Sequence, residues 1–193
     1  MELSGRQQEI VEAAMQLISE RSIQELTIKN LAARLGLTEA ALYRHFRGKN
    51  DILVAMLEQF ARRADAVRGT VLARDGAPID LIGEIFLAHI RGFVQRPPMA
   101  DVVFSEEIFR NDSTLAATVQ RIMTTNTAAM LDLVSRGQKA RQIRTDVHAR
   151  LLTTMIIGTL RMLVTQWRMG GFAGDLARSG RDAWHGLRRM IAA

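Results

Sequence analysis

The chain contains no cysteine, and this absence removes a whole group of chemistries. Without thiols there is no disulfide framework, thiolate zinc site, iron–sulfur cluster or cysteine nucleophile. Long apolar runs are missing too, because the stretch from Leu151 to Leu163 is interrupted by Thr153, Thr154 and Arg161. That stretch is shorter than the roughly 18 to 20 residues a membrane span needs, so we expect no transmembrane helix.

Proline and aromatic residues are scarce, with 3 prolines and 5% aromatics among 193 residues. Low-complexity tracts and internal repeats are absent as well, which argues against disordered linkers and solenoids. The opening residues Met1 to Ser4 are acidic and polar and carry no apolar signal-peptide core. Together with the lack of cysteine, this predicts a cytoplasmic protein of one globular unit or two small ones.

Charge is the first feature that points towards function. Lys and Arg number 26 against 20 acidic residues, so the net charge is +6 and the isoelectric point is near 10.8. A basic balance attracts nucleic acid or acidic surfaces in general. Many soluble proteins are mildly basic without a specific reason, so only the distribution of the charge along the chain can separate these two interpretations.

Helical periodicity dominates the first third of the chain. Ser4 and Gln7 have the spacing of a capping box, and the apolar positions that follow recur every three to four residues. Thr27 is a suitable N-cap for a short helix that ends at Gly36. Thr38 can then cap a third helix, which carries Phe46 inward before Gly48 interrupts it, and a fourth helix is expected from about Asp51 to Arg63.

Longer helices follow beyond the basic stretch from Arg62 to Ala77. One begins near Pro78 and is stopped by the Pro97–Pro98 pair, and a short segment runs from about Met99 to Phe109. Further helices are expected from about residue 112 or 113 to 137, from 146 to 169 and from 175 to 193. No alternating pattern typical of strands competes with them, so the fold class is predicted to be all-α.

The stretch from Thr27 to Phe46 has the dimensions of a helix-turn-helix motif, with two short helices joined by a turn at Gly36. In such a motif the second helix enters the major groove while the first braces against the backbone. Between residues 27 and 50 the chain carries five basic residues and one acidic residue, a local balance of +4. The positive charge of the N-terminal region is therefore concentrated on the helix pair.

Three segments, Thr27–Ala32, Gly36–Thr38 and Ala41–Lys49, resemble the DNA-binding signature of the tetracycline-repressor family of bacterial transcriptional regulators. The most specific part is the string Leu-Tyr-Arg-His-Phe at residues 42–46, followed by Lys49. The resemblance covers about residues 4 to 64, and the remainder is similar only in length and helical pattern. It implies an N-terminal three-helix DNA-binding domain at 1–64 and a helical effector-binding and dimerisation domain at 65–193.

The resemblance also implies roles for ten residues. Phosphate contacts are expected from side chains that can donate a hydrogen bond to phosphate oxygen, at Tyr43, His45 and Lys49, with Thr27 and Thr38 as helix caps that also touch phosphate. Contacts with base edges are expected at Lys29, Glu39, Ala40, Ala41 and Arg44, since Arg and Lys suit guanine, Glu suits cytosine and Ala suits the thymine methyl group.

Two aromatic residues and one histidine have simpler interpretations. Tyr43 and Phe46 could both be core aromatics; we accept this for Phe46, which shares the inward face with Leu42, but not for Tyr43, whose hydroxyl needs a polar partner. His45 could be a solvated surface residue with no role in binding.

In the second domain, the resemblance implies that the last two helices pair with those of a second subunit. The small residues Thr154, Gly158 and Thr159 would allow close approach of a partner helix; the alternative is that they pack within the subunit. A small-molecule pocket is expected among ten mostly apolar residues, each of which could instead be plain core: Phe86, His89, Phe93, Phe104, Phe109, Met123, Met130, Met155, Met162 and Trp167.

No cofactor or metal site is expected. His89 and His148 lack partners at metal-ligand spacing, and the acidic pairs Glu106–Glu107 and Asp80–Glu84 are most simply solvated. The predicted function is a homodimeric repressor that binds a palindromic double-stranded DNA operator and is released by a small apolar or amphipathic effector. Two alternatives stay open, an enzyme with scattered catalytic residues and a DNA-bound protein that acts on other proteins without an inducer.

Overall fold

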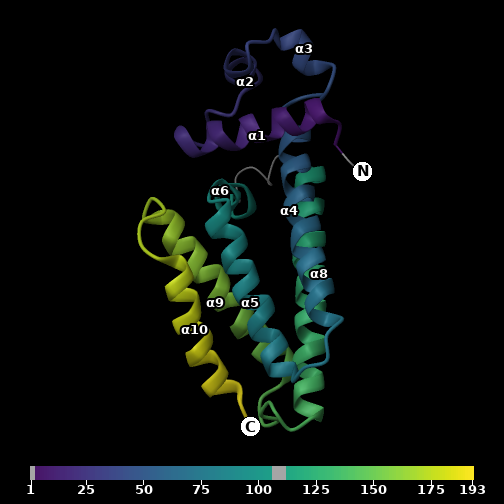
Figure 1. The fold of residues 1–193 in the computed structure, drawn as a ribbon, viewed down its shortest axis with the longest axis vertical. Helices are drawn as coiled ribbons and strands as arrows, with labels where there is room; N and C mark the ends of the chain where they lie inside the picture. The colour runs from purple at the N-terminus through teal and green to yellow at the C-terminus, as the bar shows by residue number, and fades with distance from the viewer. Residues whose placement is uncertain (1–2, 106–111) are drawn as a thin grey trace. The chain divides into compact units, whose positions relative to one another are not determined.

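The computed structural model describes residues 3–105 and 112–193, and these residues fold into α-helices joined by short turns (Figure 1). The predicted all-α class is confirmed. In chain order the helices are α1 (Gly5–Glu20), α2 (Ile28–Leu35), α3 (Glu39–Tyr43), α4 (Lys49–Leu72), α5 (Pro78–Gln95), α6 (Pro98–Val103), α8 (Ser113–Lys139), α9 (Ala149–Met169) and α10 (Leu176–Ile191). No helix in the described ranges is both long and apolar enough to cross a membrane.

The chain divides into two compact units. The first comprises residues up to Ala61 together with Pro97–Gln120, and the second comprises Arg62–Arg96 and Arg121–Ala193. Helices α4 and α8 each contribute to both units, and the expected boundary between residues 64 and 65 falls within α4. Each unit is described by itself below.

The first unit is built on helix caps that the sequence predicts. The Ser4 hydroxyl accepts from the Gln7 backbone N–H at 3.3 Å, and the Ser4 N–H donates to the Gln7 side chain at 3.0 Å, which completes the capping box of α1. Helix α1 then packs on α2 and α6, and α2 packs on α3. Ile10, Leu31 and Leu42 are 0% exposed, and each such burial stabilises the unit by about 1.5–3 kcal/mol.

Helix α4 is longer than its expected range of Asp51 to Arg63, since it continues to Leu72. The basic stretch that follows Arg62 does not break the helix, because Arg and Ala favour helical geometry and the stretch up to Leu72 contains no proline and one glycine, Gly69. Arg68 also makes side-chain hydrogen bonds with Asp65 and with Asn126 of α8. The hydrogen bond between Arg68 and Asn126 joins distant segments and leaves no mark in local apolar periodicity, so periodicity alone predicted too early an end for α4.

The second unit is organised around the close approach of α10 to α5, with α9 packed on both (Figure 1). Gly83 of α5 leaves room for Trp184, because a Cβ at Gly83 would lie 2.3 Å from the indole Nε1. Gly180 of α10 likewise faces Ile90, whose side-chain carbons would lie 3.0 Å from an added Cβ. Gly180 therefore sits inside α10 as a packing residue, and the helix starts at Leu176 with Asp175 as its cap, close to the expected residue 175.

The start of α9 lies three residues later than expected, at Ala149 rather than Asp146. Asp146 is held in the preceding turn by a salt bridge of 2.6 Å with Arg144. Gln138 of α8 fastens the same turn, because its side-chain amide donates to the carbonyls of Arg144 and Val147 at 2.8 Å each. These contacts occupy the residues that would otherwise form the first turn of the helix.

Candidate nucleic-acid interface

The pair formed by α2 and α3 has the cap and turn geometry of a helix-turn-helix. Thr27 Oγ1 accepts from the Asn30 N–H at 3.1 Å, and Thr38 Oγ1 accepts from the Ala41 N–H at 3.2 Å. Gly36 lies between the helices at φ +65°, in the left-handed region that favours glycine. The two threonine caps and the turn at Gly36 are thus confirmed, although α3 ends at Tyr43, earlier than expected.

The ten predicted DNA-binding residues all keep some solvent exposure. Tyr43 is 52% exposed, whereas Phe46 and Leu42 are 7% and 0% exposed, so the two aromatic residues lie on opposite sides of the motif. Three of the ten are half-buried, namely Ala41, His45 and Lys49. The other seven are exposed: Thr27, Lys29, Thr38, Glu39, Ala40, Tyr43 and Arg44.

Two of the five basic residues in the motif are already paired with carboxylates. Arg34 reaches Glu20 of α1 at 2.6 Å, and Arg47 reaches Asp51 of α4 at 2.8 Å. Each arginine lowers the pKa of its carboxylate partner chiefly through the side-chain hydrogen bond. Glu20 and Asp51 lie just outside the window of residues 27–50, and including them lowers the local charge from +4 to +2.

Lys29 and Arg44 are therefore the cations on this surface that are most available to DNA. Both are exposed, and neither forms a salt bridge with another described residue. Arg44 follows the last turn of α3, while Lys29 lies in the first turn of α2. A guanidinium and an ammonium in these places can donate to base edges or to phosphates.

Lys49 combines a structural contact with a position suited to phosphate. It is the first residue of α4, where the helix dipole favours an anion, and its ammonium donates to the carbonyl oxygen of Ile23 at 3.0 Å. Burial lowers the pKa of this lysine from its usual value. An ammonium has three N–H donors, so those not used by Ile23 can reach a phosphate oxygen.

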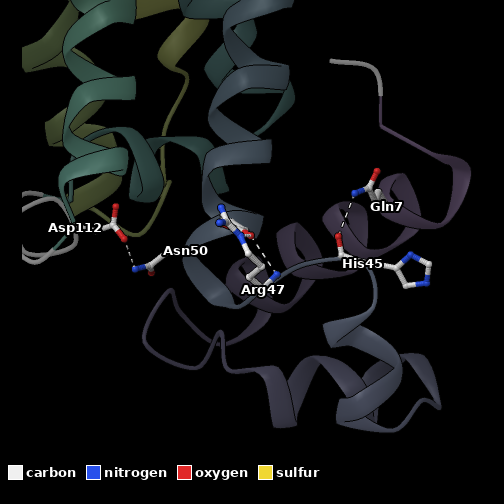
Figure 2. Close-up of polar contacts among 6 residues, drawn as sticks. Gln7, His45, Arg47, Asn50 and Asp112 are labelled. Atoms are coloured by element: carbon white, nitrogen blue, oxygen red, sulfur yellow. Dashed lines mark hydrogen bonds and ion pairs between the residues drawn. The ribbon is translucent and has the colours of Figure 1, made fainter.

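Gln7 and Asn50 support the motif through contacts that the sequence did not reveal (Figure 2). The Gln7 side-chain amide donates to the backbone carbonyl of His45 at 3.1 Å, while the imidazole of His45 points away from that contact. Asn50 donates to Asp112 at 2.7 Å, and Asp112 also caps α8 by accepting from the Leu115 N–H. The capping box revealed Gln7 only as a local cap, because its contact with His45 spans 38 positions.

The predicted effector-pocket residues fall into several environments. Phe86, Phe93 and Met130 are buried, and His89, Phe104, Met155 and Trp167 are half-buried. Met123 and Met162 are 43% and 57% exposed, so these two side chains face outward on the single chain. Phe104 belongs to the first unit, unlike the other described pocket candidates, and Phe109 lies outside the described residues, as do Glu106 and Glu107.

Two of these residues pack on other aromatic residues in the second unit. The rings of Phe86 and Trp184 lie 5.9 Å apart, and Trp167 contacts Phe172 edge-on at 4.9 Å. The structure outlines a small recess of about 240 Å³ beside Trp167, at the turn between α9 and α10. Across the described parts of the chain, no three His, Asp or Glu residues gather as metal ligands would.

Comparisons with known proteins agree with this architecture. Residues 10–56 match the family described as bacterial regulatory proteins, tetR family, and residues 67–188 match the C-terminal region of YsiA-like protein. The fatty acid metabolism regulator protein of Bacillus subtilis is 21% identical over 173 residues, which cover 87% of this chain and 86% of that protein.

Solved structures show the same fold. The ketosteroid transcriptional regulator KstR2 of Mycobacterium tuberculosis superposes with a TM-score of 0.83 at 18% identity, over 100% of this chain and 97% of that one. The transcriptional regulator FadR of Bacillus subtilis in complex with stearoyl-CoA gives a TM-score of 0.77 at 19% identity, over 93% and 96%. Since the two family matches extend through both units and the capped helix pair has the expected form, the chain belongs to the tetR family of DNA-binding transcriptional regulators.

Proposed function

We propose that the protein is a homodimeric repressor that binds a palindromic operator and is released from it by a small apolar or amphipathic effector. The observation that carries the proposal is the exposed polar surface of α3, held between the Thr38 cap and the buried Leu42 and Phe46. A short helix that buries one face and exposes the other can enter the major groove, which is about 12 Å wide.

On this surface, Arg44 and Lys29 read guanine, Glu39 accepts from cytosine, and Ala40 and Ala41 pack on thymine methyl groups. The exposure of Lys29, Glu39, Ala40 and Arg44 supports these assignments. Tyr43, His45 and Lys49 donate to phosphates, together with the Thr27 and Thr38 caps. Phosphate contacts of this kind fix the register of the protein, while the base contacts select the sequence.

The dimer forms through α9 and α10. Leu151, Thr154, Gly158 and Met162 follow a helical stripe on α9 and are all exposed, and a Cβ at Gly158 would meet only open space. An apolar stripe with a glycine at its centre lets a second helix approach closely. A two-fold dimer then presents two α3 helices about 34 Å apart, one turn of DNA, which matches a palindrome.

The effector binds the second domain, residues 65–193, while residues 1–64 form the DNA-binding domain. The apolar residues Phe86, Phe93 and Met130 supply the surroundings that an apolar body requires. The complex of the FadR structure with stearoyl-CoA supports an amphipathic effector with a long apolar part. An effector that binds more tightly to the DNA-free state lowers operator affinity by the ratio of its two affinities.

This function needs neither catalysis nor a cofactor, and it places the protein in the cytoplasm with the DNA. Selection of bound duplexes from a random pool tests the DNA-binding half of the proposal. We expect the selected duplexes to share an inverted repeat, with half-sites about one helical turn apart. Selected sequences without two-fold symmetry would overturn the dimeric arrangement, and a pool with no enrichment would overturn sequence-specific binding.

The second half of the proposal is tested on the selected operator. A stearoyl-CoA titration, followed by fluorescence anisotropy of labelled operator, should release the DNA. Free CoA is the matched control, because it lacks the apolar chain. Equal release by both compounds would contradict an apolar binding site.

A further inference from the structure

His89 has an unusual position in the second unit. Its Nδ1 lies 2.8 Å from the carbonyl oxygen of Ile85, one turn earlier in α5. A carbonyl only accepts hydrogen bonds, so Nδ1 carries the proton and Nε2 of the neutral ring is an acceptor. Nε2 is buried and has no hydrogen-bond partner among the described residues.

Burial, opposed by the bond with Ile85, keeps the pKa of His89 below its usual value. The positive charge of Arg68 acts in the same direction as burial, while Asn126 and Asp65 act against it. The ring is therefore neutral at physiological pH. The buried acceptor Nε2 of this neutral ring therefore lacks a hydrogen-bond donor among the described residues.

Arg68 and Asn126 form a fixed polar pair that acts on this ring from two other helices. The guanidinium of Arg68 donates to Asn126 Oδ1 at 2.6 Å and to Asp65 at 2.7 Å, and the Arg68 side chain is 12% exposed. Because Oδ1 of Asn126 accepts from Arg68, its Nδ2 is the donor end of the amide. Asn126 comes from α8, Arg68 from α4 and His89 from α5.

We propose that this cluster recognises an uncharged hydroxyl group on an otherwise apolar effector. The hydroxyl donates to His89 Nε2 and accepts from Asn126 Nδ2, since a hydroxyl is both donor and acceptor. A carboxylate fits less well, because it offers no donor to Nε2 and Asp65 already neutralises Arg68. The apolar body lies against Phe86 and Phe93, which are on the same helix as His89.

The inference rests on the proposed effector-binding function and adds a route to the DNA-binding domain. Arg68 belongs to α4, the same helix that begins at Lys49. A hydroxyl that accepts from Asn126 Nδ2 adds a contact to the same amide whose Oδ1 accepts from Arg68, and thus changes the tie between α4 and α8. Differential contacts of this kind are what an effector needs in order to shift a conformational equilibrium.

The experiment compares three probes on the full-length protein by isothermal titration calorimetry. n-Decanol has the hydroxyl, methyl nonyl ether has the same number of heavy atoms without an O–H, and decanoate has a charge. We expect n-decanol to bind about tenfold more tightly than the ether, because the ether leaves Nε2 without a donor. Decanoate should bind more weakly than n-decanol.

Three variants separate the hydrogen bond from general packing. His89→Phe keeps a ring but removes the acceptor, so n-decanol and the ether should bind almost equally. His89→Gln retains an acceptor and should restore part of the preference, which also covers the case in which His89→Phe fails to fold. Thr153→Val is the matched control, because it removes another buried polar group of this unit and should leave the preference unchanged.

Several outcomes overturn the inference. Equal binding of n-decanol and the ether by the natural protein, tighter binding of decanoate, or a preference that survives His89→Phe would each do so. Failure of every alkanol from n-octanol to n-hexadecanol to bind would do so too. If n-decanol binds as expected but leaves operator affinity unchanged, recognition of the hydroxyl by His89 is supported and the proposed release from DNA is rejected.

If methyl nonyl ether and n-decanol release DNA equally, effector-driven release is supported and recognition of the hydroxyl by His89 is rejected.

Discussion

The two units hold their polar groups in different ways. In the helix-turn-helix, the caps at Thr27 and Thr38 join atoms only three residues apart. In the second unit, the bond from Arg68 to Asn126 spans 58 positions, and the bond from Arg144 to the Met190 carbonyl spans 46. The caps that start the two exposed helices are set by local chain geometry, whereas the cluster at His89 exists only when distant helices have packed. We therefore expect substitutions in the second unit to lower stability, and substitutions on the exposed surface of the helix pair to change DNA binding.

The largest effect is expected from Trp184→Ala in the second unit. Trp184 is 8% exposed, fills the space beside Gly83 and packs on Phe86, so its removal should lower the free energy of unfolding by about 3–5 kcal/mol. Urea unfolding followed by circular dichroism measures the loss. Trp167→Ala is the control, because Trp167 is only half-buried and should cost less. A smaller loss at Trp184 than at Trp167 would contradict the link between burial and stability in this unit.

Arg44→Ala should leave the stability unchanged and still damage function. Arg44 is exposed and lies outside the core, so the variant should unfold at the same urea concentration. Discrimination for the base pair that Arg44 reads should fall by about 1–3 kcal/mol. Titrations of matched and mismatched operators by fluorescence anisotropy measure this change.

Lys49→Ala is the comparison for Arg44→Ala. It should weaken binding to all sequences by a similar factor and also lower stability by about 1 kcal/mol, since the Ile23 carbonyl loses its donor. Equal losses of discrimination in Arg44→Ala and Lys49→Ala would contradict the assignment of Arg44 to base contacts and Lys49 to phosphate contacts.

A smaller effect should separate the free cations from the paired ones. Lys29→Gln should reduce the slope of log affinity against log salt concentration, because it removes an exposed cation that no carboxylate on the protein neutralises. Arg34→Gln should change this slope less, because Arg34 already forms a salt bridge with Glu20. The two slopes are measured on the selected operator between low and moderate salt. A larger change for Arg34→Gln would show that the salt bridge opens on DNA.

The smallest effect is expected at Asp51, whose pKa is lowered chiefly by its hydrogen bond with Arg47. A carboxylate whose pKa is lower in the folded state stabilises the protein above its unfolded pKa, and this contribution is lost as the pH falls through the folded pKa. Asp51→Asn should therefore cost less than about 1 kcal/mol at neutral pH, and the difference should vanish in acid.

Urea unfolding at several pH values measures this difference. Asp132→Asn should cost less, since Asp132 lies 3.7 Å from Arg136 on an exposed helix surface. A difference between Asp51→Asn and the natural protein that grows towards acid would reverse the assigned sign.

The predictable parts of the molecule are those with short-range causes. The Ser4, Thr27 and Thr38 caps and the turn at Gly36 follow from single residues and their nearest neighbours along the chain, and the structure confirms all four. The burial of Phe46 and the exposure of Tyr43 follow from helical periodicity in the same way. The same features predicted a helix-turn-helix motif from Thr27 to Phe46.

The features missed by sequence reasoning depend on packing between distant segments. The extension of α4 to Leu72, the role of Gln7 beside His45 and the pairing of Arg34 with Glu20 all require contacts across many residues. The same holds for the cluster around His89. Apolar periodicity marked His89 as one of ten pocket candidates, but it carried no information on the partners Asn126 and Arg68. The predicted contacts with DNA and effector remain predictions that the experiments above test.

The two salt bridges on the DNA-facing motif have a consequence for how the protein searches the chromosome. With Arg34 and Arg47 neutralised by Glu20 and Asp51, we expect fewer counterions to be displaced when the protein binds a sequence that it does not recognise. We therefore expect its stay at such sites to be brief, and prolonged residence to depend on the base contacts proposed for Arg44 and its neighbours. Weak non-specific binding would thus leave a larger fraction of the protein molecules free to sample new DNA sites.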